Sequence, residues 1–275
     1  MFKKVAIDKQ NHKHDLFERI QKAFTEAGYG NDSMTRNYLL MFDEVNAAFS
    51  HELASEIFLN GLKVLDVGCG LGGLCRMLAE NYNCSATGID LSADHIHAAV
   101  KLSEFMGISD RTQFFRADAL DLPFEDNSFD IVWTQHTQMN IMDKEKFYSE
   151  INRVLIKEGA FVFFDVFARN LEKMNYPLPW AENQHFNFLI SFSRMENLLR
   201  EMGFEKLKSS NQTGSTRLAL QNVLSKSKRN KLTKNALQIR FGNTFKKKIK
   251  NLLKVIESGA VELQSGIYRK TTINN

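Results

Sequence analysis

The glycine-rich stretch LDVGCGLGG, residues 65–73, limits most strongly what this chain can fold into. An apolar run at 62–68 leads into it, and apolar residues at helical spacing follow it. This order predicts a buried strand, a tight turn and a helix. Gly68, Gly70 and Gly73 have the G-x-G-x-x-G spacing of dinucleotide-binding turns. The spacing alone does not tell which cofactor such a turn would hold.

Strand-like segments alternate with amphipathic helical patterns from residue 62 onward. Such alternation predicts right-handed crossovers and a Rossmann-like, doubly wound α/β sheet with helices on both faces. The expected strands are 62–68, 85–91, 112–118, 129–135, 157–167, 205–213 and 260–270. Two expected helix faces consist of Ala98, Leu102, Phe105 and Met106 before Gly107, and of Phe147, Ile151, Val154 and Leu155.

Two regions are expected along the chain. Residues 1–61 read as a helical lid or substrate cap, and residues 62–275 as the core domain. A helical insertion at about 214–257 is expected before the last strand.

Charge is distributed unevenly along the 275 residues. The segment 206–256 holds 14 Lys and Arg and no acidic residue, which leaves 22 basic against 32 acidic residues elsewhere. A solvated helical face is the simpler interpretation of this segment. The alternative is a weak anionic partner, such as RNA, a phospholipid surface or an acidic protein. The acidic remainder makes DNA an unexpected partner, and we expect a monomer or a homodimer.

The N-terminal residues and the cysteines favour a cytoplasmic protein. No apolar run follows the first lysines, and no window approaches the length of a membrane span. Cys69, Cys75 and Cys84 have neither metal-site nor disulfide spacing. His95 and His97, two residues apart on an expected helix, would point to different faces, so no metal site is expected.

Three acidic residues bear on which cofactor the glycine turn holds. Asp66, two residues before the first glycine, would repel a pyrophosphate but attract a ligand carrying an amine and a sulfonium. Asp90, at the end of the second expected strand, suits two ribose hydroxyls in either kind of site. Asp118 could accept the amino group of adenine while the Ala119 backbone N–H donates to a ring nitrogen. The Y-x-x-x-K pair of short-chain dehydrogenases is absent from the sequence.

Four ordered motifs, VLDVGCGLGG, GIDLS, ADALDLPFEDNSFD and RVL…EGAFVFFDV, lie between residues 62 and 167. Together they resemble the class I S-adenosylmethionine (SAM)-dependent methyltransferases. The resemblance implies a seven-stranded sheet with an antiparallel last strand, SAM as cofactor and S-adenosylhomocysteine (SAH) as product. The residues that it assigns to the cofactor are Asp66, Gly68, Cys69 and Gly70 for the methionine part, Asp90 for the ribose, Leu91, Asp118 and Ala119 for the adenine, and Gln135 near the active-site mouth.

Weaker similarity extends to the sarcosine/dimethylglycine N-methyltransferase branch, through MFDEVN, YPLPWAENQHFNFL and GNTFKKKIKNL. Two departures are clear. Residues 43–48 lack the branch's histidine and glycine pair, and IKEGA replaces its Lys-Pro-Gly-Gly turn. The resemblance implies methyl transfer to a small-molecule amine nitrogen. The alternatives are a quinone-like carbon or oxygen acceptor, an RNA methyltransferase using 206–256, and an NAD-binding Rossmann protein.

Acceptor-binding residues are expected after the fourth and fifth strands, in the stretches WTQHTQMNI and YPLPWA. His136 could orient or deprotonate a nucleophile, or only hydrogen-bond within the fold. Tyr176 and Trp180 could wall a pocket or hold a cation against their rings, or pack as an ordinary surface loop. The expected substrate residues are Tyr29, His136, Asn140, Tyr176 and Trp180, with His136 as the candidate catalytic group.

Overall fold

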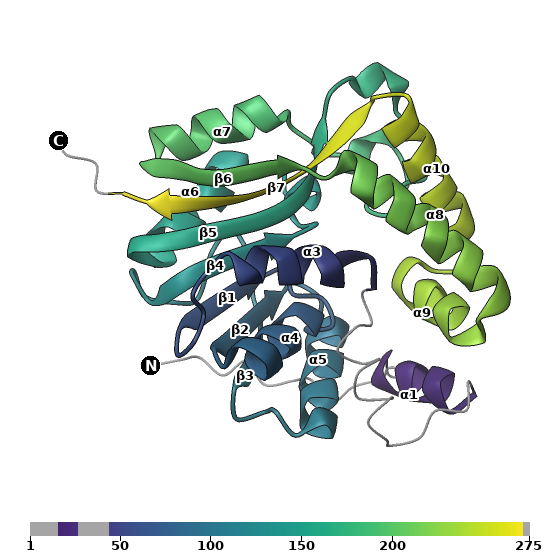
Figure 1. Ribbon diagram of the computed structural model, residues 1–275, viewed down its shortest axis with the longest axis horizontal. Helices are drawn as coiled ribbons and strands as arrows, with labels where there is room; N and C mark the ends of the chain where they lie inside the picture. Colours follow the sequence, from purple (N-terminus) through teal and green to yellow (C-terminus); the bar gives the residue numbers. More distant parts are fainter. Residues whose placement is uncertain (1–15, 27–43, 272–275) are drawn as a thin grey trace.

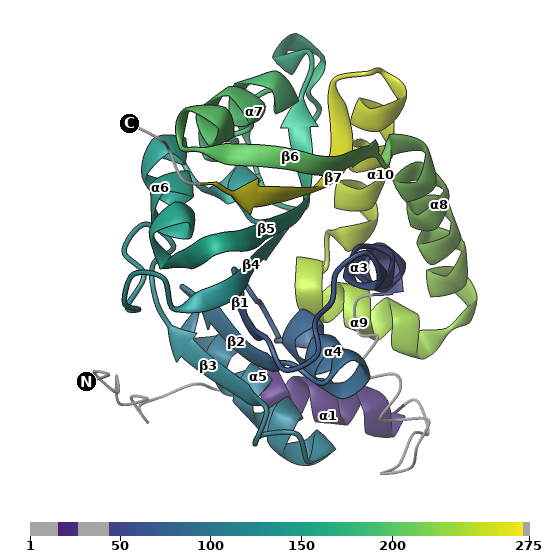
Figure 2. The same ribbon diagram turned by 60° about the vertical axis from the view of Figure 1, so that its left-hand side comes forward.

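The computed structural model describes residues 16–26 and 44–271, which form one sheet with helices on both faces (Figures 1 and 2). The strands are β1 (Lys63–Val67), β2 (Ser85–Asp90), β3 (Thr112–Arg116), β4 (Phe129–Gln135), β5 (Leu155–Ala168), β6 (Phe204–Asn211) and β7 (Val261–Lys270). The α-helices are α1 (Leu16–Glu26), α3 (Glu44–Ser55), α4 (Gly73–Tyr82), α5 (Ala93–Met106), α6 (Lys144–Val154), α7 (Phe192–Glu201), α8 (Thr213–Arg229), α9 (Lys231–Phe241) and α10 (Phe245–Glu257). Short 3-10 turns are η1 (Gln138–Asn140), η2 (Leu171–Lys173) and η3 (Gln184–Phe186).

The strands form a seven-stranded sheet in the order β3-β2-β1-β4-β5-β7-β6. Six strands run parallel, and β7 is antiparallel to its neighbours β5 and β6. The predicted fold class is therefore confirmed. After β3 the chain crosses back over the sheet to β4, beside β1, so the strand order reverses at β1 and β4. A crevice outside the carboxyl ends of the strands is expected at such a switch point.

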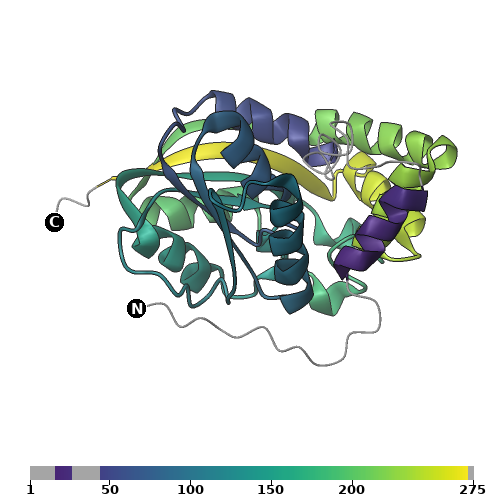
Figure 3. The ribbon, with the colours of Figure 1, turned by 90° about the horizontal axis from the view of Figure 1, so that it is seen from below.

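Strand β5 shows why the sheet is buried on both faces. Val162, Phe164 and Val166 pack in one apolar cluster, whereas Phe161 and Phe163 pack in another. This alternation follows from the two-residue period of a strand. The first cluster includes side chains of α3, α4 and α10, and the second includes side chains of α6 and α7. Seen from below, the sheet lies between these two layers (Figure 3).

Helices α8, α9 and α10 follow one another between β6 and β7 and lie together at one side of the molecule (Figure 1). Helix α1 contacts α9 and α5, and α3 contacts α4, α8, β5 and β7. Segments before β1 and before β7 therefore gather on the same side as α4. Among the described helices, none has the length and apolar content to cross a membrane.

Two details of the predicted helix faces are wrong. Phe105 is 38% exposed, while Ser103 is buried on α5 in its place. The buried face of α5 follows the four-residue steps of Ala98, Leu102 and Met106, and Phe105 lies beside this stripe rather than within it. Leu155, expected on a helix, is instead the first residue of β5.

Candidate active site

The glycine turn lies at the switch point of the sheet. The backbone N–H groups of Gly68 and Cys69 both donate to the Ile89 carbonyl, at 2.8 Å each, which ties the turn to the end of β2. Gly68 has φ 82°, and a Cβ there would lie 2.5 Å from Thr137 Oγ1. Only glycine combines this conformation with this close approach. Gly70 differs, because nothing lies within 4 Å of where its Cβ would be, so its side of the turn is open.

Asp90, at the carboxyl end of β2, is held as an oriented carboxylate. Its Oδ2 accepts from Gly70 N at 3.0 Å, and its Oδ1 accepts from Ser92 N at 2.8 Å. His95 Nδ1 lies 3.3 Å from Oδ1. Burial raises the pKa of Asp90, but these hydrogen bonds outweigh burial and leave its pKa below the ordinary value. The side chain is therefore ionised and fixed beside the glycine turn, at the carboxyl end of β2.

Leu91, next to Asp90, presents its side chain outward. It is 66% exposed, although its neighbours on β2 are buried or half-buried. An apolar surface at this place suits the face of a planar base.

Asp66 is more deeply buried than its predicted role requires. It is 3% exposed and lies within β1, where its Oδ2 is 3.6 Å from Cys75 Sγ in α4. The pKa of Asp66 is raised to about 7. Burial is the main cause, the charge of Asp90 adds to the rise, and the hydrogen bond from Cys75 acts against it. Asp66 therefore lies beneath the turn as a carboxyl that titrates near neutrality. A cationic ligand above it would favour its ionised form.

Cys69 turns its side chain away from the open side of the turn. A Cβ on Gly88 of β2 would lie 2.7 Å from Cys69 Sγ, so the sulfur packs directly on that strand. Burial raises the pKa of the Cys69 thiol well above its ordinary value. Any contact that Cys69 makes with a ligand in the crevice would thus come from its backbone.

The segment after β3 meets the end of β2, as Asp118 and Ala119 require for their predicted roles. Ala117 N donates to the Asp90 carbonyl at 3.2 Å, which places the two segments side by side. Asp118 is exposed, and its Oδ1 accepts from Leu120 N at 2.9 Å. Asp90, Leu91 and Asp118 therefore lie at one edge of the sheet.

Gln135 is the last residue of β4, and His136 follows it beyond the carboxyl end of the strand. Ser50 Oγ of α3 donates to Gln135 Oε1 at 3.0 Å, while Gln135 Nε2 is buried and has no hydrogen-bond partner in the ranges 16–26 and 44–271. His136 has φ 54°, a strained conformation for a histidine, and its ring lies 4.8 Å from that of Phe164. Helix α3, from the predicted lid, thus reaches the end of β4.

Asp165 is the residue of this site that sequence reasoning missed. Its Oδ2 accepts from both Thr137 N and Gln138 N at 3.1 Å, and its Oδ1 from Val166 N at 3.0 Å. Burial raises the pKa of Asp165 to about 7, against the lowering effect of these hydrogen bonds. The only signal in the sequence is an acid inside the apolar run VFFDVF. This carboxyl group orders the loop that carries His136.

The other predicted substrate residues differ in their placement. Tyr176 Oη accepts from Asn187 Nδ2, and Trp180 Nε1 donates to Asn187 Oδ1, both at 3.0 Å. One amide therefore bridges the two aromatic residues, and both rings pack on the apolar cluster that contains Phe164. Asn140 is exposed on η1. Tyr29 lies outside the described residues.

Helix α10 carries much of the basic segment as an amphipathic surface helix. Ile249, Leu252, Val255 and Ile256 are buried against the core. Lys246, Lys247, Lys250 and Lys254 are exposed on the other side. This is the pattern of a solvated helix face, and an anionic partner stays a prediction.

Comparison with known proteins agrees with this geometry. Residues 65–163 match the family model described as methyltransferase domain. Tocopherol O-methyltransferase, chloroplastic, from Arabidopsis thaliana is 38% identical over 122 residues, which is 44% of this chain and 35% of that protein. Ajmaline N-methyltransferase from Rauvolfia serpentina is 33% identical over 121 residues, 44% of this chain and 42% of that protein. The alignments thus span less than half of these relatives.

A crystal structure of a putative sarcosine dimethylglycine methyltransferase from Galdieria sulphuraria has the same fold. Its TM-score is 0.69 at 20% identity, and the match covers 81% of this chain and 84% of that one. The sheet order and the glycine turn agree with the match of residues 65–163 to a methyltransferase domain.

Proposed function

We propose that this chain binds SAM at the carboxyl ends of β1, β2 and β4 and transfers its methyl group to a small-molecule acceptor. One observation carries the proposal: Asp90 is an ionised carboxylate joined by Gly70 N–H to the glycine turn, at the switch point of the sheet. A carboxylate there can accept both hydroxyls of a ribose.

The surrounding residues fit the rest of such a cofactor. Leu91 offers an exposed apolar face and Asp118 an acceptor for an adenine amino group. On the other side, the buried Nε2 of Gln135 has no partner among the described residues and could donate to a polar group of the ligand. Asp66 supplies a negative charge beneath the turn. When bound, the cofactor supplies an activated methyl group on a sulfonium.

The protein's part in such a reaction is mainly positioning. Holding the acceptor in line with the methyl group removes much of the entropic barrier. Transfer to the acceptor would leave the electron pair of the methyl–sulfur bond on sulfur, so these residues would need to supply no oxidant or reductant. Asp165 fixes the loop that presents His136, which would receive a proton if the acceptor arrives protonated. Helix α3 reaches Gln135 through Ser50, which supports a covering role for the N-terminal region.

For the acceptor, we propose an amine nitrogen. Tyr176 and Trp180 are fixed by Asn187, and two oriented aromatic rings can stabilise an ammonium group through cation–π contacts. An N-methyltransferase is among the relatives. A quinone-like carbon or oxygen acceptor is the second candidate, because the relative from Arabidopsis thaliana is named tocopherol O-methyltransferase.

The test combines binding and turnover. Purified protein is titrated with SAM, SAH and NAD by calorimetry, then incubated with labelled SAM and a panel of small amines, quinones and RNA. We expect SAM and SAH to bind, NAD not to bind, and label to enter an amine. Label entering only quinones or RNA would replace the proposed acceptor. Tight NAD binding without SAM binding would overturn the proposal altogether.

A further inference from the structure

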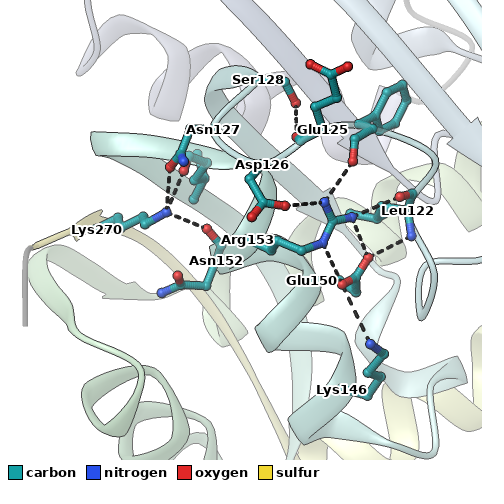
Figure 4. A network of polar contacts seen from close by, with 12 residues as sticks. Leu122, Glu125, Asp126, Asn127, Ser128, Lys146, Glu150, Asn152, Arg153 and Lys270 are labelled. Carbon is teal, nitrogen blue, oxygen red and sulfur yellow. Dashed lines mark hydrogen bonds and ion pairs between the residues drawn. The ribbon is translucent and has the colours of Figure 1, made fainter. Parts of the chain in front are cut away.

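Arg153 of α6 is the centre of a dense polar network on the segment that follows Asp118 and Ala119 (Figure 4). Its guanidinium donates to the backbone carbonyls of Leu122 at 2.9 Å and Phe124 at 2.7 Å. The same group donates to Asp126 Oδ1 at 2.9 Å. One side chain thus bonds three successive points of the loop between β3 and β4.

Glu150, one helical turn earlier, completes the attachment. Its Oε2 accepts from Leu122 N at 2.8 Å, and Arg153 donates to both of its oxygens, also at 2.8 Å. The Glu150 side chain is only 5% exposed. The hydrogen bonds from Arg153 are the main cause that lowers the pKa of Glu150, so this carboxylate is ionised. Both backbone polar groups of Leu122 are therefore held by an ion pair on α6.

The far end of the loop is attached to the same helix. Asn127 N donates to the Arg153 carbonyl at 2.9 Å, and Ser128 N to the Val154 carbonyl at 2.8 Å. Lys270 Nζ of β7 donates to Asn127 Oδ1 at 3.1 Å and to the Asn152 carbonyl at 2.8 Å. Figure 4 shows Lys270 between Asn127 of the loop and Asn152 of α6.

Within the part of the chain that the structure describes, Asp118 is held by its own turn. Leu120 N donates to its carboxylate, and Asp121 N donates to its carbonyl. The next anchored residue along the chain is Leu122. Because a short turn transmits the position of one end to the other, the placement of Asp118 relative to Asp90 depends on how firmly Leu122 is held.

We propose that Glu150 and Arg153 are positioning residues for recognition of the cofactor's base. They hold the segment after β3 so that Asp118 and the Ala119 N–H meet the edge of adenine, although neither touches the ligand. This inference rests on the proposed function, in which that segment reads adenine. It makes α6, on the face of the sheet opposite α4, a determinant of base selectivity.

The experiment measures base selectivity rather than stability. Affinities for SAH and for S-inosylhomocysteine, in which an oxo group replaces the adenine amino group, are compared by calorimetry for the wild type, Arg153→Met and Arg153→Lys. We expect Arg153→Met to weaken SAH binding about tenfold, the loss expected for removing one charged hydrogen bond. The preference for SAH over S-inosylhomocysteine should fall by a similar factor. Arg153→Lys, which cannot reach both carbonyls, should lie in between.

Arg194→Met is the matched control, since Arg194 forms an exposed ion pair with Glu145 at the other end of α6. It should leave both affinities unchanged. Hydrogen exchange of the wild type and Arg153→Lys adds a second measurement if Arg153→Met fails to fold. Faster exchange confined to residues 117–128, together with lost base selectivity, supports the inference.

The possible failures are distinguishable. If the wild type binds neither ligand, the proposed function itself is wrong. If the wild type prefers SAH and the Arg153 variants keep the full preference, Arg153 is only structural and the inference is overturned. Loss of affinity for both ligands by the same factor also overturns it, because that result shows no effect on the base.

Discussion

Replacing Asp66 with Asn should stabilise the protein without ligand at alkaline pH. Asp66 is buried, and its one described hydrogen bond comes from the weak donor Cys75 Sγ at 3.6 Å. Burial raises its pKa from 3.8 to about 7. The unfolded chain therefore releases this proton at lower pH than the folded protein does. Folding stability falls as pH rises from about 4 to 7, and the full penalty is present above pH 7.

The magnitude follows from this interval. At about 1.4 kcal/mol for each pH unit, the penalty of ionising Asp66 reaches about 4 kcal/mol above pH 7. Asparagine has nearly the same size and stays neutral, so Asp66→Asn avoids the penalty. In urea unfolding, the stability of the variant minus that of the wild type should increase by about 3 kcal/mol between pH 5 and pH 8. A difference that does not change with pH would refute the reasoning.

Binding should show the opposite effect. If the ionised carboxylate attracts the cationic cofactor, wild-type affinity for SAM should rise about tenfold from pH 6 to pH 8, as a group with pKa near 7 loses its proton. The Asp66→Asn variant should bind more weakly and show no such rise from this group. Calorimetric titrations at both pH values test this, and a wild-type affinity that falls with pH would contradict it.

Three further outcomes are expected. Gly68→Ala should destabilise the protein by about 1–3 kcal/mol, because φ 82° is strained for alanine and its Cβ would meet Thr137. Thermal unfolding without ligand measures this, and an unchanged melting temperature would argue against it. Asp90→Ala should weaken SAM binding at least about tenfold, since two ribose hydroxyls lose their acceptor; equal affinity by calorimetry would rule out the ribose role. Asp165→Asn should cost about 1–3 kcal/mol at pH 4, because an amide nitrogen replaces an acceptor of backbone N–H groups. Above pH 7 this cost is offset, because the variant also avoids the ionisation penalty that follows from the raised pKa of Asp165. Urea unfolding at pH 4 checks this, and a variant stabilised at that pH would contradict it.

The fold was predictable because each strand and each helix has its own pattern of apolar residues over a short stretch of sequence. Alternating strand and helix patterns determine which faces are buried, and parallel strands bring their carboxyl ends to one edge. Asp90 and Asp118 could be assigned to that edge from their positions at strand ends alone. Phe105 could not be placed in this way, because a residue beside an apolar stripe is buried only if another element covers it.

Other parts of the site could not be read from the sequence. Asp165 acts on Thr137 and Gln138, which are 28 and 27 residues away, and Arg153 acts on Leu122, which is 31 residues away. These contacts depend on the register of β4 against β5 and on the packing of α6. A motif that lists residue types along the chain carries no information on either.

The sequence by itself determined the order of the elements, the glycine turn and the acids that follow the strands, because these depend on local conformation and hydrophobic period. Only the tertiary structure decided how each carboxyl behaves. Hydrogen bonds from neighbouring groups lower the pKa of Asp90 and keep it ionised, whereas burial raises the pKa of Asp66 and of Asp165 to about 7. The physical reason is that desolvation and hydrogen bonding depend on what surrounds a side chain in space, and most of those neighbours come from other elements.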